Sequence, residues 1–125
     1  MTPKIKIKEQ RFVFDISNMF TYVKLQHPGV PEDSLQNLTV TIIGYVLCRQ
    51  LHLNIDNWNE IKYTYSFYKH SSLDNKRLIE NLESMYEKLL FPYLYLFNLS
   101  HTYIHPIVTY QLDDQHLVID LKDKG

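Results

Sequence analysis

The sequence predicts a single α+β domain in which a small, mostly antiparallel sheet packs against three or four helices. Alternating apolar and polar residues near both ends of the chain are typical of strands. The middle of the chain instead repeats apolar residues at three and four positions, as amphipathic helices do. A chain of 125 residues has the length of one compact domain, so we expect residues 1–125 to share one core.

The N-terminal region is expected to contribute one bulged strand or two short strands followed by a helix. Residues 5–8 alternate apolar and cationic side chains, and residues 12–14 are apolar. From Ser17 onward, apolar residues at helical spacing predict a short helix, with Asp15 or Ser17 as its cap. This helix must end before Pro28, because a loop containing two prolines and a glycine follows.

A second helix is predicted from Pro31 to about His52. Proline is tolerated in a first helical turn, and Leu35, Leu38 and Ile42 keep helical spacing. An alternative is a buried strand over residues 39–47, because residues 39–43 are all β-branched and Gly44 interrupts the pattern.

Residues 57–69 support two interpretations, of which we favour a helix. Asn57 and Glu60 have the spacing of a capping box. A helix would place Trp58, Ile61, Tyr65 and Tyr68 on one stripe. A strand would instead alternate Ile61, Tyr63, Tyr65 and Phe67 with more polar residues.

The clearest amphipathic helix is predicted over residues 74–90. We expect Asp74 to cap it and Leu73 to pack against Leu78 in a hydrophobic staple. Pro92 should stop the helix near Leu90 or kink it toward residue 97. Residues 89–99 are almost wholly apolar, so this run is either deeply buried or covered on one side by a partner.

The C-terminal part is predicted to form a hairpin. Residues 107–110 and 117–119 have strand character and flank the turn-forming residues 113–115. With the N-terminal strand, this hairpin would form a sheet that joins the two ends of the chain.

Composition excludes several classes of protein. Thirteen basic against fourteen acidic residues give a net charge of −1, which suits neither a strongly basic nucleic-acid binder nor an acidic DNA mimic. The single cysteine cannot form an intrachain disulfide, and no leader-like or membrane-spanning apolar run is present, so we expect a cytoplasmic protein without a membrane role. The absence of alanine and the ten tyrosines are typical of the AT-rich genes of a low-GC bacterium, a phage or a mobile element.

No motif indicates catalysis or a cofactor. His101 and His105 have the spacing of two metal ligands on one helical face, but no third ligand has supporting spacing, so no metal site is expected. Cys48 lies in an apolar stretch typical of an inert thiol. We therefore expect no catalytic residue, no cofactor and no enzymatic activity.

The abundant aromatic residues favour a non-enzymatic protein-interaction module: an inhibitor, an accessory subunit or a homo-oligomer. Tyrosine and tryptophan can bury a ring at an interface while keeping a polar atom hydrogen-bonded. The candidate partner-binding residues are Trp58, Tyr63, Tyr65, Tyr68, Tyr93 and Tyr95. The competing interpretation is that these rings fill the core.

The alternative function is an accessory role in nucleic-acid metabolism, through single-strand binding. Cations interleaved with aromatic rings hold single strands by phosphate contacts and base stacking. The candidate residues are Lys62, Lys69, Lys76 and Arg77, which lie near three tyrosines in the sequence. Lys4, Lys6 and Lys8 form a second basic group on the first predicted strand.

Overall fold

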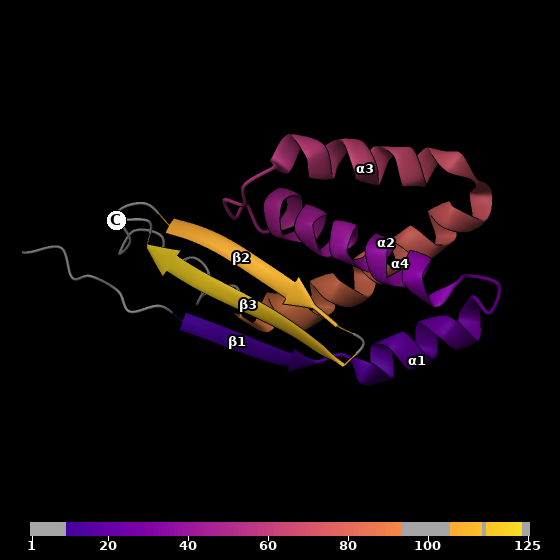
Figure 1. The fold of residues 1–125 in the computed structure, drawn as a ribbon, viewed down its shortest axis with the longest axis horizontal. Coiled ribbons are helices and arrows are strands. Elements are labelled where there is room, and N and C mark those ends of the chain that lie inside the picture. The colour runs from indigo at the N-terminus through magenta and orange to yellow at the C-terminus, as the bar shows by residue number, and fades with distance from the viewer. Residues whose placement is uncertain (1–9, 94–105, 114, 124–125) are drawn as a thin grey trace, which may run out of the picture.

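The computed structural model describes residues 10–93, 106–113 and 115–123, and these residues form a small α+β fold (Figure 1). The elements in chain order are β1 (Gln10–Asp15), α1 (Ser17–Gln26), α2 (Glu32–Tyr45), the π-helical turn η1 (Val46–Gln50), α3 (Trp58–Ser71), α4 (Leu73–Leu90), the 3₁₀ turn η2 (Phe91–Tyr93), β2 (Pro106–Leu112) and β3 (His116–Asp123). The predicted fold class is confirmed.

The sheet joins the two ends of the chain, as predicted. Its strand order is β1-β3-β2 and both pairings are antiparallel, so β3 lies in the centre. Phe14 lies opposite Leu117, and Val108 lies opposite Leu121. All four are buried, because alternate residues of a strand point to the same face of the sheet.

The helices cover one face of the sheet in two layers. Figure 1 shows α2 between the sheet and α3, and α2 contacts both β2 and α3. Helix α3 also packs against α4, which leaves its opposite face on the outside of the molecule. The core between these layers is apolar and includes Ile42, Ile43, Leu47, Ile79 and Leu82.

Both segments with competing interpretations are helical. The strand alternative for residues 39–47 is wrong, because α2 continues to Tyr45 and the Thr39 hydroxyl donates to the Leu35 carbonyl one turn earlier, at 2.7 Å. The strand alternative for residues 57–69 is also wrong, since these residues belong to α3. Tertiary packing of the apolar stripes outweighs the β-propensity of the β-branched and aromatic residues.

Two predicted helix caps differ from the structure. Asn57 adopts a left-handed conformation, with φ of 62°, and its side chain forms no capping hydrogen bond, so the predicted capping box does not form. Helix α4 is capped by Ser72, whose hydroxyl accepts from the Asn75 amide at 3.1 Å, and Asp74 lies inside the first turn. Leu73 is 69% exposed and forms no staple.

The predicted cap of α1 is wrong, whereas the predicted end of α4 is confirmed. The N-cap of α1 is Ile16, which forms no side-chain cap hydrogen bond. Asp15 lies one residue earlier and accepts hydrogen bonds from the amide and hydroxyl of Ser17 at 3.0 and 2.6 Å. Helix α4 ends at Leu90, and Pro92 lies in the 3₁₀ turn that follows. Most of the apolar run 89–99, namely residues 94–99, lies outside the described residues. No helix in the described ranges has both the length and the apolar character needed to span a bilayer.

Candidate functional site

The connection between α2 and α3 has an unusual backbone. In η1 the Leu51 amide donates to the Val46 carbonyl at 3.0 Å, a bond that spans five residues instead of the four of an α-helix. The loop that follows contains two non-glycine residues with positive φ, His52 at 56° and Asn57 at 62°. Short π-helical turns and left-handed residues both concentrate at functional sites, which directs attention to the surface beside this connection.

A hollow of about 570 Å³, here called the η1–α3 hollow, lies at this place. Its lining comes from the end of α2, from η1 and from one face of α3, and comprises Tyr45, Arg49, Trp58, Lys62, Tyr65, Ser66, Lys69 and His70. The volume falls in the range of about 300–1,000 Å³ that is usual for small-molecule sites. Residues from both predicted site groups, the aromatic and the cationic, therefore meet here.

The aromatic wall of the hollow is a packed set of three rings. Tyr45 and Tyr65 stack in parallel, with centroids 3.7 Å apart and an interplanar angle of 3°. Trp58 lies 5.9 Å from Tyr45 at a tilted angle of 35°. Tyr65 is buried, whereas Trp58 and Tyr45 are half-buried. The parallel pair thus forms a fixed wall, beside which Trp58 keeps part of its ring in contact with solvent.

A chain of hydrogen bonds connects the hollow to α4. The Tyr65 hydroxyl donates to Glu83 Oε2 at 2.8 Å, and Lys69 Nζ donates to the same hydroxyl at 3.3 Å. Gln50 Nε2 donates to the second carboxylate oxygen of Glu83 at 3.1 Å. Burial, and then the neighbouring Glu83 carboxylate, raise the pKa of Tyr65, so this hydroxyl stays protonated as the donor. The chain holds the ammonium group of Lys69 beside the wall.

The hollow has an excess of positive charge. Arg49, Lys62 and Lys69 all line it, and within the described ranges none of them forms an ion pair with a carboxylate. The nearby carboxylate of Glu83 already accepts hydrogen bonds on both oxygens. The hollow therefore presents cations that an anionic ligand could neutralise.

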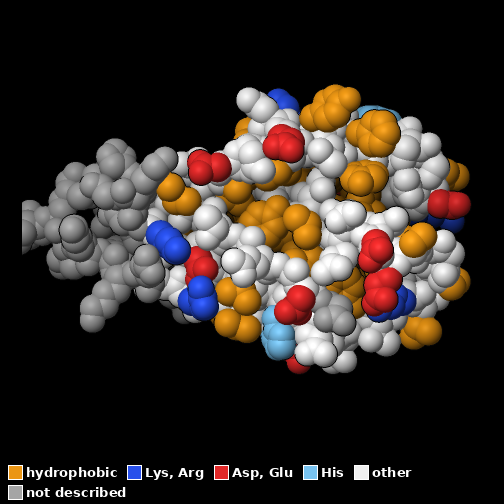
Figure 2. Space-filling model, viewed as in Figure 1, with side chains coloured by type: hydrophobic (Ala, Val, Ile, Leu, Met, Phe, Trp, Pro, Cys, Tyr) orange, Lys and Arg blue, Asp and Glu red, His pale blue; other side chains and the backbone are white. Residues whose placement is uncertain are grey.

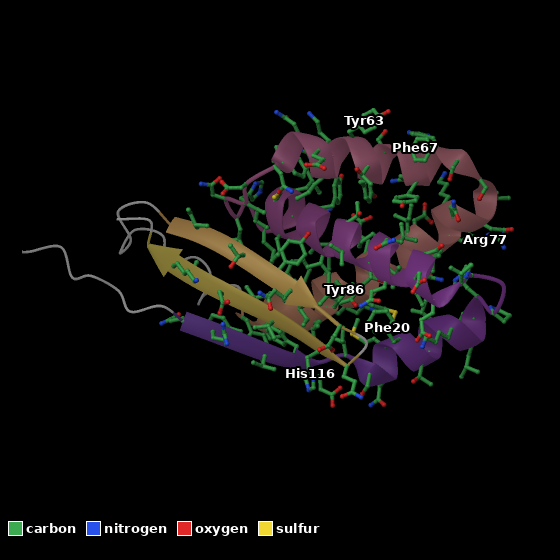
Figure 3. All side chains as sticks on the ribbon, in the orientation of Figure 1. Phe20, Tyr63, Phe67, Arg77, Tyr86 and His116 are labelled. Atoms are coloured by element: carbon green, nitrogen blue, oxygen red, sulfur yellow. The ribbon has the colours of Figure 1, made fainter. Side chains whose placement is uncertain are left out.

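The outer face of α3 carries a second feature, here called the α3 ridge. It consists of Tyr63 and Phe67, which are 73% and 61% exposed and lie one helical turn apart. Figure 2 shows hydrophobic side chains on this edge of the molecule, and Figure 3 shows both rings pointing away from the helix into solvent. A shallow hollow of about 300 Å³ borders the ridge, lined also by Ser66, His70 and Ser71.

The candidate partner-binding residues on α3 lie in three different environments. Tyr63 belongs to the α3 ridge, and Trp58 lines the η1–α3 hollow. Tyr65 is a core residue, and Tyr68 is half-buried against the core. The helical stripe Trp58–Ile61–Tyr65–Tyr68 is thus the inward face of α3, and only Tyr63 lies on the opposite face.

Of the two remaining aromatic candidates, only Tyr93 is described, and it does not extend this surface. Tyr93 lies in η2, where its ring meets Phe14 of β1 edge-to-face at a centroid distance of 4.9 Å. Tyr95 lies outside the described residues.

The candidate nucleic-acid-binding residues divide into two groups. Lys62 and Lys69 line the η1–α3 hollow, whereas Lys76 and Arg77 lie near the start of α4 and do not line it. Figure 3 shows Arg77 at the end of the molecule farthest from the sheet. Lys4, Lys6 and Lys8 lie outside the described residues.

Sequence reasoning missed Phe67, Arg49 and His70 as site residues. Phe67 could have been found, because a helix places it one turn after Tyr63 on the face opposite the apolar stripe. Arg49 had no local signal, since its place in the hollow depends on the tertiary arrangement that brings η1 and α3 to the same surface.

No group of three potential metal ligands occurs among the described residues, and the pair His101 and His105 lies outside them. No protein-family model, no curated protein and no solved structure matches the chain. The α3 ridge and the η1–α3 hollow are therefore the features from which function is inferred.

Proposed function

We propose that this protein is a non-enzymatic protein-interaction module that docks a partner protein on the α3 ridge. The observation that supports this proposal is the exposure of Tyr63 and Phe67 on one face of α3. Two large aromatic rings in solvent, one turn apart, resemble the aromatic anchors that dominate protein interfaces. Their rings have no structural role in the described core, since the apolar stripe of α3 lies on the other side.

The charges beside the ridge indicate the chemistry of the partner. Glu60 is exposed three residues before Tyr63, and His70 lies three residues after Phe67 in the shallow hollow. Lys62 and Lys69 instead line the η1–α3 hollow. A partner surface with apolar side chains for the two rings, and with a cation opposite Glu60, would complement this arrangement.

The one cysteine supports both the absence of catalysis and a cytoplasmic location in this proposal. Burial raises the pKa of the Cys48 thiol, which disfavours the thiolate form that a nucleophile needs. A chain without a disulfide is also compatible with the reducing cytoplasm.

The test is a comparison of two double variants on different helices. Tyr63→Ser/Phe67→Ser removes the ridge, and Tyr22→Ser/Leu25→Ser removes two exposed apolar side chains of α1. Tagged wild type and both variants are used to capture proteins from nuclease-treated lysate of the source cells. The captured protein is then purified, and its affinity for wild type and for each variant is measured by calorimetry. We expect the ridge variant to bind at least about ten-fold more weakly, while the α1 variant binds like wild type.

Both variants should melt within a few degrees of wild type, because their side chains are exposed. Three results would contradict the proposal: equal binding by the ridge variant, equal weakening by the α1 variant, or recovery of only a second copy of this chain.

A second candidate function is the accessory role in nucleic-acid metabolism, through single-strand binding. The observation that favours it is the meeting of three cations with a partly exposed tryptophan in the η1–α3 hollow. Aromatic rings next to basic side chains are the usual means of holding unpaired nucleotides.

A further inference from the structure

We propose that the η1–α3 hollow is a binding site for one nucleotide unit, with its phosphate held by Arg49 and Lys62 and its base stacked on Trp58. This inference rests on the second candidate function and is independent of docking at the α3 ridge. Two sources share this chemistry, a free mononucleotide and one residue of an unpaired strand, and titration with both ligands distinguishes them.

The cations of the hollow support an anionic ligand. Arg49 comes from η1 and Lys62 from α3, so two separately positioned elements direct positive charge toward the same space. Neither residue forms an ion pair within the described part of the chain, and both are exposed. The planar guanidinium fork of arginine matches two phosphate oxygens, and lysine adds a point charge. Lys69 is different, since its ammonium group already donates to Tyr65.

The aromatic wall supports a ligand with a planar ring. The Tyr45–Tyr65 pair is already stacked at 3.7 Å, so it cannot admit a base between its rings. Trp58 stands at the edge of this pair with its ring tilted by 35° and half-buried. A base that stacks on the free part of Trp58 would extend the existing row of rings toward the cations.

A second hollow places polar groups within reach of the same ligand. It measures about 210 Å³, shares Arg49 and Trp58 with the η1–α3 hollow, and is lined also by His52 and Asn54. Arg49 and Trp58 therefore stand at the junction of the two spaces. The left-handed backbone of His52 lies in this lining, and such a backbone is retained in a protein only where its surroundings hold it in place.

An acidic peptide would use only half of these features. Its carboxylates would pair with Arg49 and Lys62, but it would leave the exposed part of Trp58 without the planar group that a base provides. We therefore favour a nucleotide, and the peptide becomes one outcome of the test.

The test uses the intrinsic fluorescence of Trp58, which is the only tryptophan in the chain. The full-length protein is titrated at low and physiological salt with uridine monophosphate, with a decamer of deoxythymidine, with inorganic pyrophosphate, with heparin and with a decaglutamate peptide. We expect saturable quenching by the mononucleotide, the decamer or both, because a stacked base quenches the indole. Binding of the decamer alone would identify a strand as the source, and equal affinity of the two would identify the free nucleotide.

Two charge-matched variants distinguish binding in the hollow from non-specific electrostatic attraction to the protein surface. Arg49→Gln/Lys62→Gln and Lys76→Gln/Arg77→Gln each remove two positive charges, but only the first pair lines the hollow. We expect the first variant to weaken nucleotide binding at least ten-fold and the second to change it less than two-fold.

Several results would overturn this inference. These are an equal loss of binding in the two charge variants, the absence of quenching by both nucleotide ligands, and equal or tighter binding of pyrophosphate, heparin or decaglutamate. The variant Tyr63→Ser/Phe67→Ser should retain nucleotide binding. Its behaviour therefore distinguishes a failure of this inference from a failure of docking at the α3 ridge.

Discussion

At the scale of single residues, Gly44 shows how close the sheet and the helices approach each other. The hydroxyl of Tyr110 on β2 donates to the Val40 carbonyl of α2 at 2.7 Å. A Cβ at position 44 would lie 2.5 Å from that hydroxyl and 2.9 Å from a methyl carbon of Ile61. An added Cβ would have to displace the ends of these two side chains, so the close approach of α2, α3 and β2 favours glycine although it costs helix stability.

We expect Gly44→Ala to lower the free energy of unfolding by about 1–3 kcal/mol. Without these contacts, replacing glycine by alanine in a helix interior would raise the free energy of unfolding by up to about 1 kcal/mol. Denaturant unfolding measures the change, and Gly29→Ala is the control because no atom lies within 4 Å of its added Cβ. Adding Tyr110→Phe to Gly44→Ala should restore part of the loss, since it removes the nearer of the two clashing atoms. Stabilisation by Gly44→Ala alone would disprove this close approach.

At the scale of elements, the start of α4 illustrates how a cap is chosen by geometry. Ser72 has an extended backbone, with φ of −163° and ψ of 161°, which directs its hydroxyl to the Asn75 amide. Asp74, which the sequence favoured, lies two residues further along and contributes only its charge near the positive end of the helix dipole.

Ser72→Ala should destabilise the protein by about 1 kcal/mol, because the Asn75 amide loses its capping partner. Asp74→Asn should cost less, at most about 0.5 kcal/mol at physiological salt. Thermal unfolding of both variants, together with hydrogen exchange of the first α4 amides, measures the difference. A larger effect of Asp74→Asn would show that the aspartate is the functional cap.

At the scale of the whole molecule, an ion pair links the first strand, β1, to the last strand, β3, across the sheet. Arg11 of β1 donates through Nε and Nη2 to the two carboxylate oxygens of Asp120 on β3, at 2.8 and 3.1 Å. These residues are also direct neighbours in the strand register. The hydrogen bonds from Arg11 hold the pKa of the Asp120 carboxyl below its usual range.

This pair should make stability sensitive to acid. A carboxyl whose pKa is lower in the folded state stabilises the fold above its unfolded pKa of about 3.9, and this contribution is lost as the pH falls through the folded value. We expect the unfolding free energy of wild type to decrease more steeply below about pH 4 than that of Asp120→Asn. Urea unfolding between pH 2.5 and 7 measures both slopes. Parallel slopes would mean that the pair does not contribute.

The sequence by itself determined the elements whose signal is local. The 3.6-residue period of apolar residues indicated the helices, and alternation around a turn indicated the hairpin, because both patterns follow from backbone geometry. Pro92 located the end of α4 for the same reason. The sequence also predicted that the N-terminal strand and the C-terminal hairpin form one sheet, because the helices lie between them in the chain.

Only the tertiary structure decided which aromatic rings are buried and which cations line the same hollow. Tyr63 and Tyr65 are two residues apart in one helix, yet packing of α3 against α2 and α4 buries the second and leaves the first in solvent. Lys62 and Arg49 line the same hollow, whereas Arg77 lies at the end of the molecule farthest from the sheet, because α3 packs against α2 and α4. Such neighbours depend on contacts distant in the chain, and the periodicity of one segment carries no information about them.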